Sequence, residues 1–226
     1  MRHTPASLPS ALLERALGLL DAAAPDRRAL LGICGLPGAG KSTLADALLA
    51  ELAELRPGQV GHVGMDAFHL ADAVLVRHGT RDVKGAPHTF DAAGYAALLA
   101  RAAGEADRTV YAPVFHREIE DSIAQESEIG ATCRLVITEG NYLLLTDAPW
   151  DELRDVLDEI WLVDVDEDVR LERMVARHER YGRSRAEAIE RTYGSDLVNA
   201  DLVRARSAQP DLIVSEDPTF GWAPHH

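Results

Sequence analysis

Short apolar runs alternate along the chain with stretches in which apolar residues recur every three or four positions. Runs of the first kind, bounded by glycine or polar residues, are typical of buried parallel strands. They lie at residues 28–35, 60–65, 134–138, 160–165 and 211–214, with a shorter one at 109–111. Helical periodicity is found at about 8–24, 41–55, 91–103, 149–157, 167–180 and from there to about 206. This alternation predicts an α/β fold with a parallel five-stranded sheet flanked by helices.

Two segments depart from the alternation. Residues 66–92 lack clear periodicity and contain Gly85 and Pro87, which predicts a long connecting loop with one helical turn. Loops of that length are uncommon in compact domains unless they have a function. The sequence YGRSRAE interrupts the last helical stretch, and we expect a helical lid at about 178–187. No shift in composition marks a linker, so residues 1–226 are predicted to form one domain.

Composition and charge exclude several classes of protein. With 46% hydrophobic residues the chain can bury a core. Its net charge of −14 argues against binding to nucleic acid or an anionic membrane, since both require clustered positive charge. Two cysteines are too few for a disulfide scaffold. No apolar run is long enough to span a membrane, and Glu14 and Arg15 interrupt the apolar stretch near the N-terminus. We therefore expect a cytoplasmic protein with a small-molecule partner, and the sequence leaves a homodimer open.

A glycine-rich segment between the first strand and the following helix matches the pattern G-x-x-x-x-G-K-[ST]. Glycines allow consecutive backbone N–H groups to converge on phosphate oxygens at a helix N-terminus. Lys41, one of only two lysines in the chain, would reach the β- and γ-phosphates, and the Ser42 hydroxyl would bind Mg²⁺. The segment is therefore predicted to be a P-loop that binds ATP. Its nucleotide-binding residues are Gly35, Leu36, Pro37, Gly38, Ala39, Gly40, Lys41, Ser42 and Thr43.

The class of P-loop protein is narrowed by what the sequence lacks. The N/T-K-x-D base reader of GTPases is absent because Lys84 follows Val83, and there is no LSGGQ-like signature of transport ATPases. The size of the chain and the lid-like interruption indicate a small-molecule kinase, in which a lid closes over the phosphates to exclude water.

Acidic residues follow two of the predicted strands. Ligands bind at the carboxyl ends of parallel strands, so Asp66, after the strand at 60–65, is expected in the same crevice as the P-loop. A carboxylate there can accept the proton of an attacking hydroxyl or hold a magnesium-bound water, and an alcohol kinase needs such a base whereas a nucleotide kinase does not. Glu139 follows the strand at 134–138, where a carboxylate that binds Mg²⁺ is expected. Ser42 and Glu139 are thus the predicted metal ligands.

Arginines recur along the helix predicted at 167–180. Arg170, Arg173 and Arg177 follow the spacing of one helical face, next to the predicted lid. A stripe of this kind favours a role in stabilising the charge of the transferring phosphoryl group. The stripe as a whole is therefore expected to contact phosphate, and Lys41 and Asp66 are predicted catalytic residues.

These motifs together resemble the uridine kinase, phosphoribulokinase and type I pantothenate kinase superfamily of P-loop kinases. GLPGAGKSTLADAL is similar to its phosphate loop, MDAFH to the motif that holds its catalytic base, and LERMVARHERYGRS to its lid. KGAPHTFD, YAPVFHREIEDS and VITEGNYLLL resemble further segments of the pantothenate kinases. The closest resemblance is to the nucleoside/nucleotide kinase-like, or fructose-transport-system kinase-like, subgroup. The resemblance implies the P-loop kinase fold, with Asp66 as base and Arg173 and Arg177 on phosphate.

The acceptor is expected to contact residues around the same crevice. Where pantothenate kinases have a tyrosine and a substrate-binding histidine, this chain has Phe115, His116 and Arg117. Arg117 indicates an acceptor with a carboxylate, a phosphate or many hydroxyls. The predicted substrate-contacting residues are Asp66, His69, His88, His116, Arg117 and Asn141.

The predicted function is transfer of the γ-phosphoryl group of ATP to a hydroxyl of a small polar metabolite, such as a sugar, a nucleoside or a pantothenate-like alcohol. Two alternatives stay open at this point. One is a regulatory protein that binds and slowly hydrolyses ATP and acts through a partner, and the other is a nucleotide kinase with a phosphate acceptor.

Overall fold

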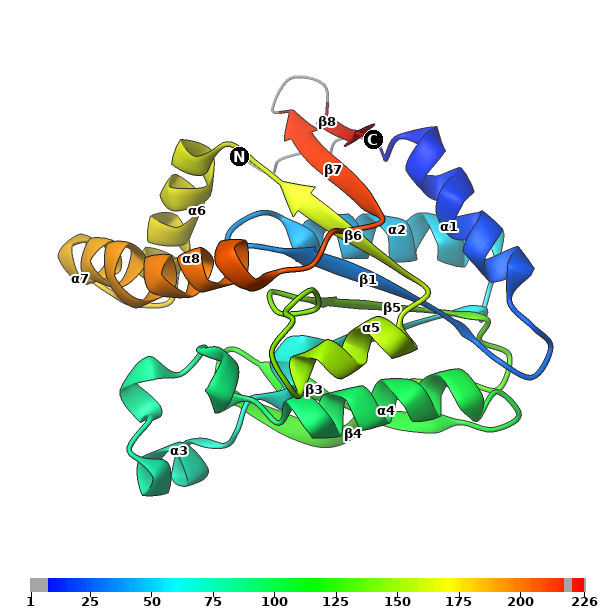
Figure 1. Cartoon of the computed structure of the whole chain (residues 1–226), viewed down its shortest axis with the longest axis horizontal. Coiled ribbons are helices and arrows are strands. Elements are labelled where there is room, and N and C mark those ends of the chain that lie inside the picture. Colours follow the sequence, from blue (N-terminus) through cyan, green and yellow to red (C-terminus); the bar gives the residue numbers. More distant parts are fainter. Residues whose placement is uncertain (1–7, 218–220, 226) are drawn as a thin grey trace.

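The central element is a six-stranded sheet, seen in a computed structural model that describes residues 8–217 and 221–225 (Figure 1). Its strand order is β2 (Val60–Gly64), β5 (Leu135–Gly140), β1 (Ala29–Gly35), β6 (Glu159–Asp164), β7 (Leu212–Asp217) and β8 (Gly221–His225). The first five strands run parallel, which confirms the predicted five-stranded parallel sheet. The sequence analysis missed the sixth strand, β8, which pairs antiparallel with β7.

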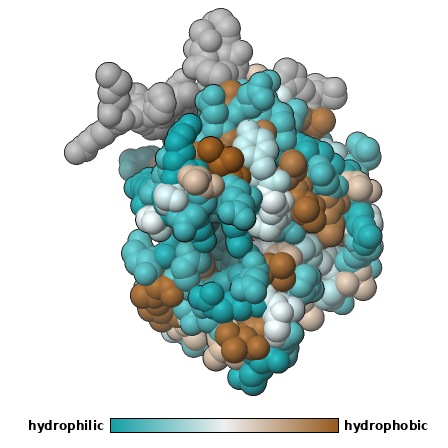
Figure 2. Space-filling model, turned by 90° about the vertical axis from the view of Figure 1, so that its left-hand side faces the viewer, coloured by the Kyte–Doolittle hydropathy of each residue, from teal (hydrophilic) through white to brown (hydrophobic). Residues whose placement is uncertain are grey.

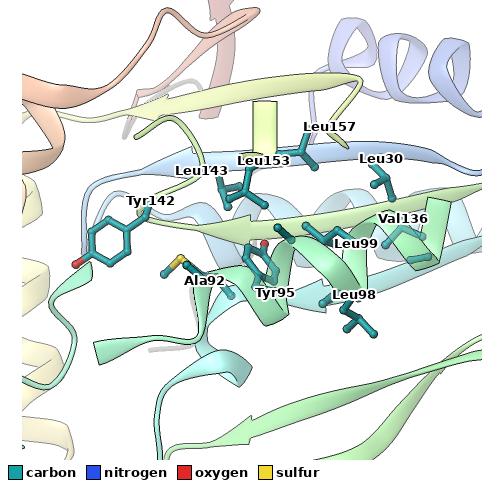
Figure 3. Close-up of a cluster of buried hydrophobic side chains, with 14 of the residues drawn as sticks. Leu30, Ala92, Tyr95, Leu98, Leu99, Val136, Tyr142, Leu143, Leu153 and Leu157 are labelled. Atoms are coloured by element: carbon teal, nitrogen blue, oxygen red, sulfur yellow. The ribbon is translucent and has the colours of Figure 1, made fainter. Parts of the chain in front are cut away.

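Helices cover both faces of this sheet (Figure 1). Helices α1 (Ser10–Ala22) and α2 (Lys41–Leu55) lie on one face, and α4 (Ala92–Gly104) and α5 (Leu153–Val156) lie on the other. Every residue of β1 is buried, because successive side chains point to opposite faces and both faces are covered. The sheet therefore separates two hydrophobic clusters, and Figure 3 shows the one that α4 and α5 cover.

Three helices follow β6 and stand at the same end of the molecule as the carboxyl ends of the strands (Figure 1). Helix α6 (Glu167–Arg180) has the predicted bounds, and Asp166 caps its N-terminus by accepting from the backbone N–H of Asp168 and Val169. After the interruption, α7 (Arg185–Arg191) begins with a capping box formed by Ser184 and Glu187. The predicted continuous helix to residue 206 is wrong in one detail, since the π-helical turn η5 (Thr192–Asp196), with its non-helical Gly194, separates α7 from α8 (Leu197–Arg206).

A two-stranded antiparallel sheet lies beside the main one. It consists of β3 (Val110–His116) and β4 (Asp121–Ile129). The sequence predicted only a short strand at 109–111 and missed β4 entirely. Most of β4 is exposed or half-buried, so it has no apolar face that an alternating pattern could reveal.

The predicted loop at 66–92 contains more structure than one helical turn. It begins with the 3₁₀ turn η1 (Met65–Phe68), continues into α3 (Asp72–His78), and ends with the 3₁₀ turns η2 (Arg81–Val83) and η3 (Pro87–Thr89). These elements are short, and the segment contributes residues both to the core, such as Met65 and Phe90, and to a cleft, which explains the lack of a continuous periodicity. The predicted helix at 149–157 is likewise shorter, a 3₁₀ turn η4 (Trp150–Glu152) followed by α5. Across the described ranges no helix has the length and apolar character needed to cross a membrane.

Candidate active site

The P-loop turns tightly from β1 into α2 and depends on glycine. Gly38 and Gly40 have φ values of 86° and 97°, a region that L-residues other than glycine rarely adopt. A Cβ atom on Gly38 would also lie 2.9 Å from the backbone oxygen of Arg170. Helix α2 begins at Lys41, so its free N-terminal amides face the loop. The backbone is therefore shaped to bind phosphate oxygens at a helix N-terminus.

Lys41 is held inside this loop. Its side chain is buried, and its Nζ donates a hydrogen bond to the Leu36 carbonyl over 3.1 Å. Burial lowers the pKa of Lys41, while the nearby carboxyl of Glu139 opposes that shift. A buried ammonium with a single backbone partner among the described residues is well placed to neutralise a phosphate.

The arginines of α6 have three different environments, and of the expected stripe Arg170 has a structural role instead. Arg170 is 1% exposed and donates to the Pro37 carbonyl over 3.1 Å and to Glu167, which makes it a buried support of the P-loop. Arg173 lies beside Gly40 and forms a bidentate pair with Glu216, at 2.5 and 3.0 Å. Arg177 faces the cleft, and its guanidinium makes no hydrogen bond within the described residues.

A cleft of about 790 Å³ opens between the P-loop, the lid helices and the β3–β4 hairpin. Figure 2 shows that side of the molecule, where a hollow lies among mostly hydrophilic residues. Several predicted residues line it, namely Pro37, Lys41, Ser42, Asp66, His69, Arg117, Glu139, Asn141 and Arg177. The sequence had placed these residues on five separate segments, and the fold brings them to one cavity.

Two carboxyl groups meet near the P-loop. Gly64, at the end of β2, pairs with Glu139 of β5, and Asp66 follows two residues later. Burial, and then the charge of Asp66, raise the pKa of Glu139 to about 7, although Lys41 and a hydrogen bond with Ser42 favour the ionised form. A cation bound at Glu139 would offset the repulsion between the two carboxylates.

The same residues fit a magnesium ion. Mg²⁺ in kinases is commonly bound by one or two carboxylates or hydroxyls plus substrate phosphates and water, rather than by a full cage of protein ligands. Ser42 and Glu139 supply such a set beside the P-loop. No larger cluster of His, Cys, Asp and Glu suited to a metal ion exists in residues 8–217 and 221–225.

Beyond Asp66 the cleft is lined by aromatic and cationic groups. Arg117 Nη2 forms an ion pair with Asp66 Oδ2 over 2.6 Å. His69 Nδ1 lies 2.8 Å from the backbone carbonyl oxygen of Asp66 and donates to it in the tautomer protonated at Nδ1, and the His69 ring packs against Phe90 and Phe115. Burial lowers the pKa of His69. This end of the cleft is therefore suited to a polar acceptor.

Two predicted contacts do not reach the cleft. His88 lies in η3 with an exposed side chain and does not line the cavity. His116 is turned across the hairpin to Glu126, with 2.5 Å between Nε2 and Oε2, because neighbouring residues along an extended strand point in opposite directions. Phe115 and Arg117 face the cavity for the same reason.

Some residues of the cleft were missed. Lys84 lines it, and so do Arg183, Arg191 and Asp196 of the lid region. Lys84 could have been found from composition, because both of the two lysines in the chain prove to lie in this one cleft. No sequence signal separated the lid residues from ordinary surface charges.

The parallel sheet, the P-loop after its first strand and the helices over the cleft define an ATP-binding P-loop kinase. No family model matches the chain. A candidate uridine kinase of Schizosaccharomyces pombe is 34% identical over 213 residues, which cover 91% of this chain and 89% of that protein. An uncharacterized protein of Escherichia coli is 35% identical over 88% of this chain and 82% of its own length.

A solved structure of a kinase is also similar to this chain. The crystal structure of a candidate fructose transport system kinase from Silicibacter sp. TM1040 superposes with a TM-score of 0.82 and 35% identity, covering 90% of this chain and 97% of the other. The chain belongs to the uridine kinase, phosphoribulokinase and pantothenate kinase superfamily of P-loop kinases.

Proposed function

We propose that this kinase transfers the γ-phosphoryl group of ATP to a hydroxyl of a small polar metabolite. The observation that carries the proposal is the position of Asp66, whose carboxylate shares one cleft with the P-loop Lys41 and with Glu139. A kinase that phosphorylates an alcohol needs a proton acceptor at this point, next to the γ-phosphate and the metal ligands.

The contacts of Asp66 suit a base. Its ion pair with Arg117 fixes the orientation of the carboxylate, while one oxygen has no partner among the described side chains. A nucleotide kinase would use cations to gather a phosphate acceptor and would need no such base, so the presence of Asp66 favours an alcohol acceptor.

Each step can be assigned to residues of the chain. The acceptor hydroxyl gives its proton to Asp66 as its oxygen attacks the γ-phosphorus, and the bond between that phosphorus and the bridging oxygen of ADP breaks. Lys41 and the P-loop amides neutralise the phosphate oxygens, and Arg177 donates to the transferring group from the lid side. Mg²⁺, held by Ser42 and Glu139, would supply further neutralisation of the phosphates.

The proposal is tested by ADP release from purified protein with Mg²⁺ and ATP, across nucleosides, sugars, pantothenate, hydroxy acids and sugar phosphates. We expect ADP production that depends on an acceptor and is lost in Lys41→Ala. Slow ADP release that no acceptor stimulates would instead support a regulatory ATPase and reject the kinase assignment.

A further inference from the structure

Two cations flank one aromatic ring in the part of the cleft beyond Asp66. Lys84 Nζ lies 5.9 Å from the centroid of the Phe115 ring, and Arg117 Cζ lies 5.8 Å from it. The ring of His69 stacks on the same phenyl group with 5.0 Å between centroids. Both cations also lower the pKa of His69, which places them near its imidazole.

The two cations keep donors that the protein does not use. Lys84 Nζ donates to Asp72 over 2.8 Å and to the Glu120 carbonyl over 2.6 Å, and an ammonium has three donors. Arg117 uses one N–H on Asp66, and its remaining donors have no hydrogen-bond partner in the part of the chain that the structure describes. Free donors that converge on one cavity are the usual means of holding an anionic group.

Lys84 and Arg117 are partly shielded from solvent, and so are their carboxylate partners Asp72 and Asp66, whereas other acidic residues of this region form an exposed rim. The side chain of Lys84 is only 14% exposed, and Arg117 is half-buried. The carboxylates of Asp82, Glu118 and Glu120, which also line the cleft, are exposed to solvent. A ligand that enters past this rim therefore meets donors in a less screened environment.

The lid fixes the position of Lys84. Arg191 of α7 donates to the backbone carbonyls of Asp82 and Lys84, at 3.2 and 3.1 Å. Among the described residues it has no carboxylate partner, so its role is to attach the loop that carries Lys84 to the lid. The donor of Lys84 is thus positioned by the same helices that cover the phosphates.

We propose that the acceptor is itself an anion, a hydroxy compound with a carboxylate or a phosphate group that Lys84 and Arg117 bind while its hydroxyl lies at Asp66. This inference rests on the proposed function and names its substrate class. Carboxylate and phosphate share the same chemistry toward these donors, and the experiment distinguishes them.

The test compares acceptors in pairs that differ only in the anionic group: gluconate with glucitol, glycerate with glycerol, and ribose 5-phosphate with ribose. Initial rates of ADP release give kcat/KM for each. We expect the anionic member of at least one pair to exceed its neutral partner at least 100-fold, and the pair that responds identifies carboxylate or phosphate. A preference for the neutral members would overturn the inference and leave the kinase assignment intact, whereas ADP release that no acceptor stimulates would reject both.

Variants of Lys84 test whether this residue binds the anionic group of the acceptor. Lys84→Met should raise KM for the anionic acceptor roughly 10- to 100-fold with little change in kcat, since a charge-assisted hydrogen bond in substrate binding is lost. Lys84→Arg should retain most of the affinity. The matched control is Arg101→Met, which removes an exposed cation of α4 whose ion-pair partner among the described residues is Glu105, and it should leave both constants unchanged. An equal loss of kcat/KM for anionic and neutral acceptors in Lys84→Met would show that Lys84 only supports the loop.

Discussion

Glutamine in place of Glu139 provides a direct test of the electrostatics of the site. The pKa of this carboxyl is raised from its ordinary value of 4.5 to about 7, first by burial and then by Asp66. In the unfolded chain the same group ionises at its ordinary value. The folded state therefore holds the proton more tightly, and its stability falls as pH rises through the interval between the two values.

The magnitude follows from the same numbers. The gap between 4.5 and about 7 corresponds to about 3 kcal/mol, of which about 2–3 kcal/mol is lost between pH 5 and pH 8. For a chain of this size such a loss lowers the melting temperature by roughly 5–10 °C. Glu139→Gln keeps the shape of the side chain but cannot ionise, so this part of the pH dependence should be absent from the variant.

The assay is thermal unfolding of the metal-free protein from pH 5 to pH 8. We expect the melting temperature of the natural protein to fall relative to the variant as pH rises. Adding Mg²⁺ and ADP at pH 8 should then stabilise the natural protein more than Glu139→Gln. Glu54→Gln, an exposed carboxylate on α2, is the control and should follow the natural protein. Parallel curves for the natural protein and Glu139→Gln would refute the reasoning.

Three further substitutions test the remaining roles. Asp66→Asn should lower kcat by about 10²–10⁴, since it removes a general base, with unchanged melting temperature and Mg²⁺·ATP affinity; a loss within a few fold would contradict a role as base. Lys41→Ala should abolish most turnover while circular dichroism stays native, and normal turnover in that variant would remove the P-loop from the mechanism. Arg170→Met should cost about 1–3 kcal/mol, because the Pro37 carbonyl and Glu167 lose a buried donor. Calorimetry should show that loss together with weaker ATP binding, and an unchanged melting temperature would mean that Arg170 does not support the loop.

The sequence predicted the backbone conformation around the phosphate site, because that conformation depends on residues that are adjacent in the chain. A P-loop needs glycine at Gly38 and Gly40 for their positive φ values, whatever surrounds them. The strand that precedes it is buried on both faces and is therefore continuously apolar. These features also predicted that Asp66 and Glu139 share a crevice, since both follow parallel strands whose carboxyl ends lie at one edge of the sheet.

The contacts of helix α6 could not be predicted in this way. Its periodicity places three arginines on one helical face. In the structure Arg170 binds the Pro37 carbonyl of the P-loop, Arg173 pairs with Glu216 of β7, and Arg177 lines the cleft. A helix rises about 1.5 Å per residue, so side chains seven residues apart meet different neighbours. Spacing within one helix cannot say which neighbours those are.

At the acceptor end of the cleft the sequence predicted Asp66, His69 and Arg117, but tertiary structure decided which of their neighbours join them. Whether His116 or Arg117 faces the cavity depends on the register of β3 against β4, and β4 carries too few buried residues to be recognised in the sequence. Lys84 is brought into the cleft by a loop that Arg191, more than a hundred residues further along the chain, holds in place. Sequence by itself determined the phosphate-binding chemistry, which short-range backbone geometry imposes. The acceptor contacts come from distant segments whose packing no local pattern encodes, and only the folded structure assembled them.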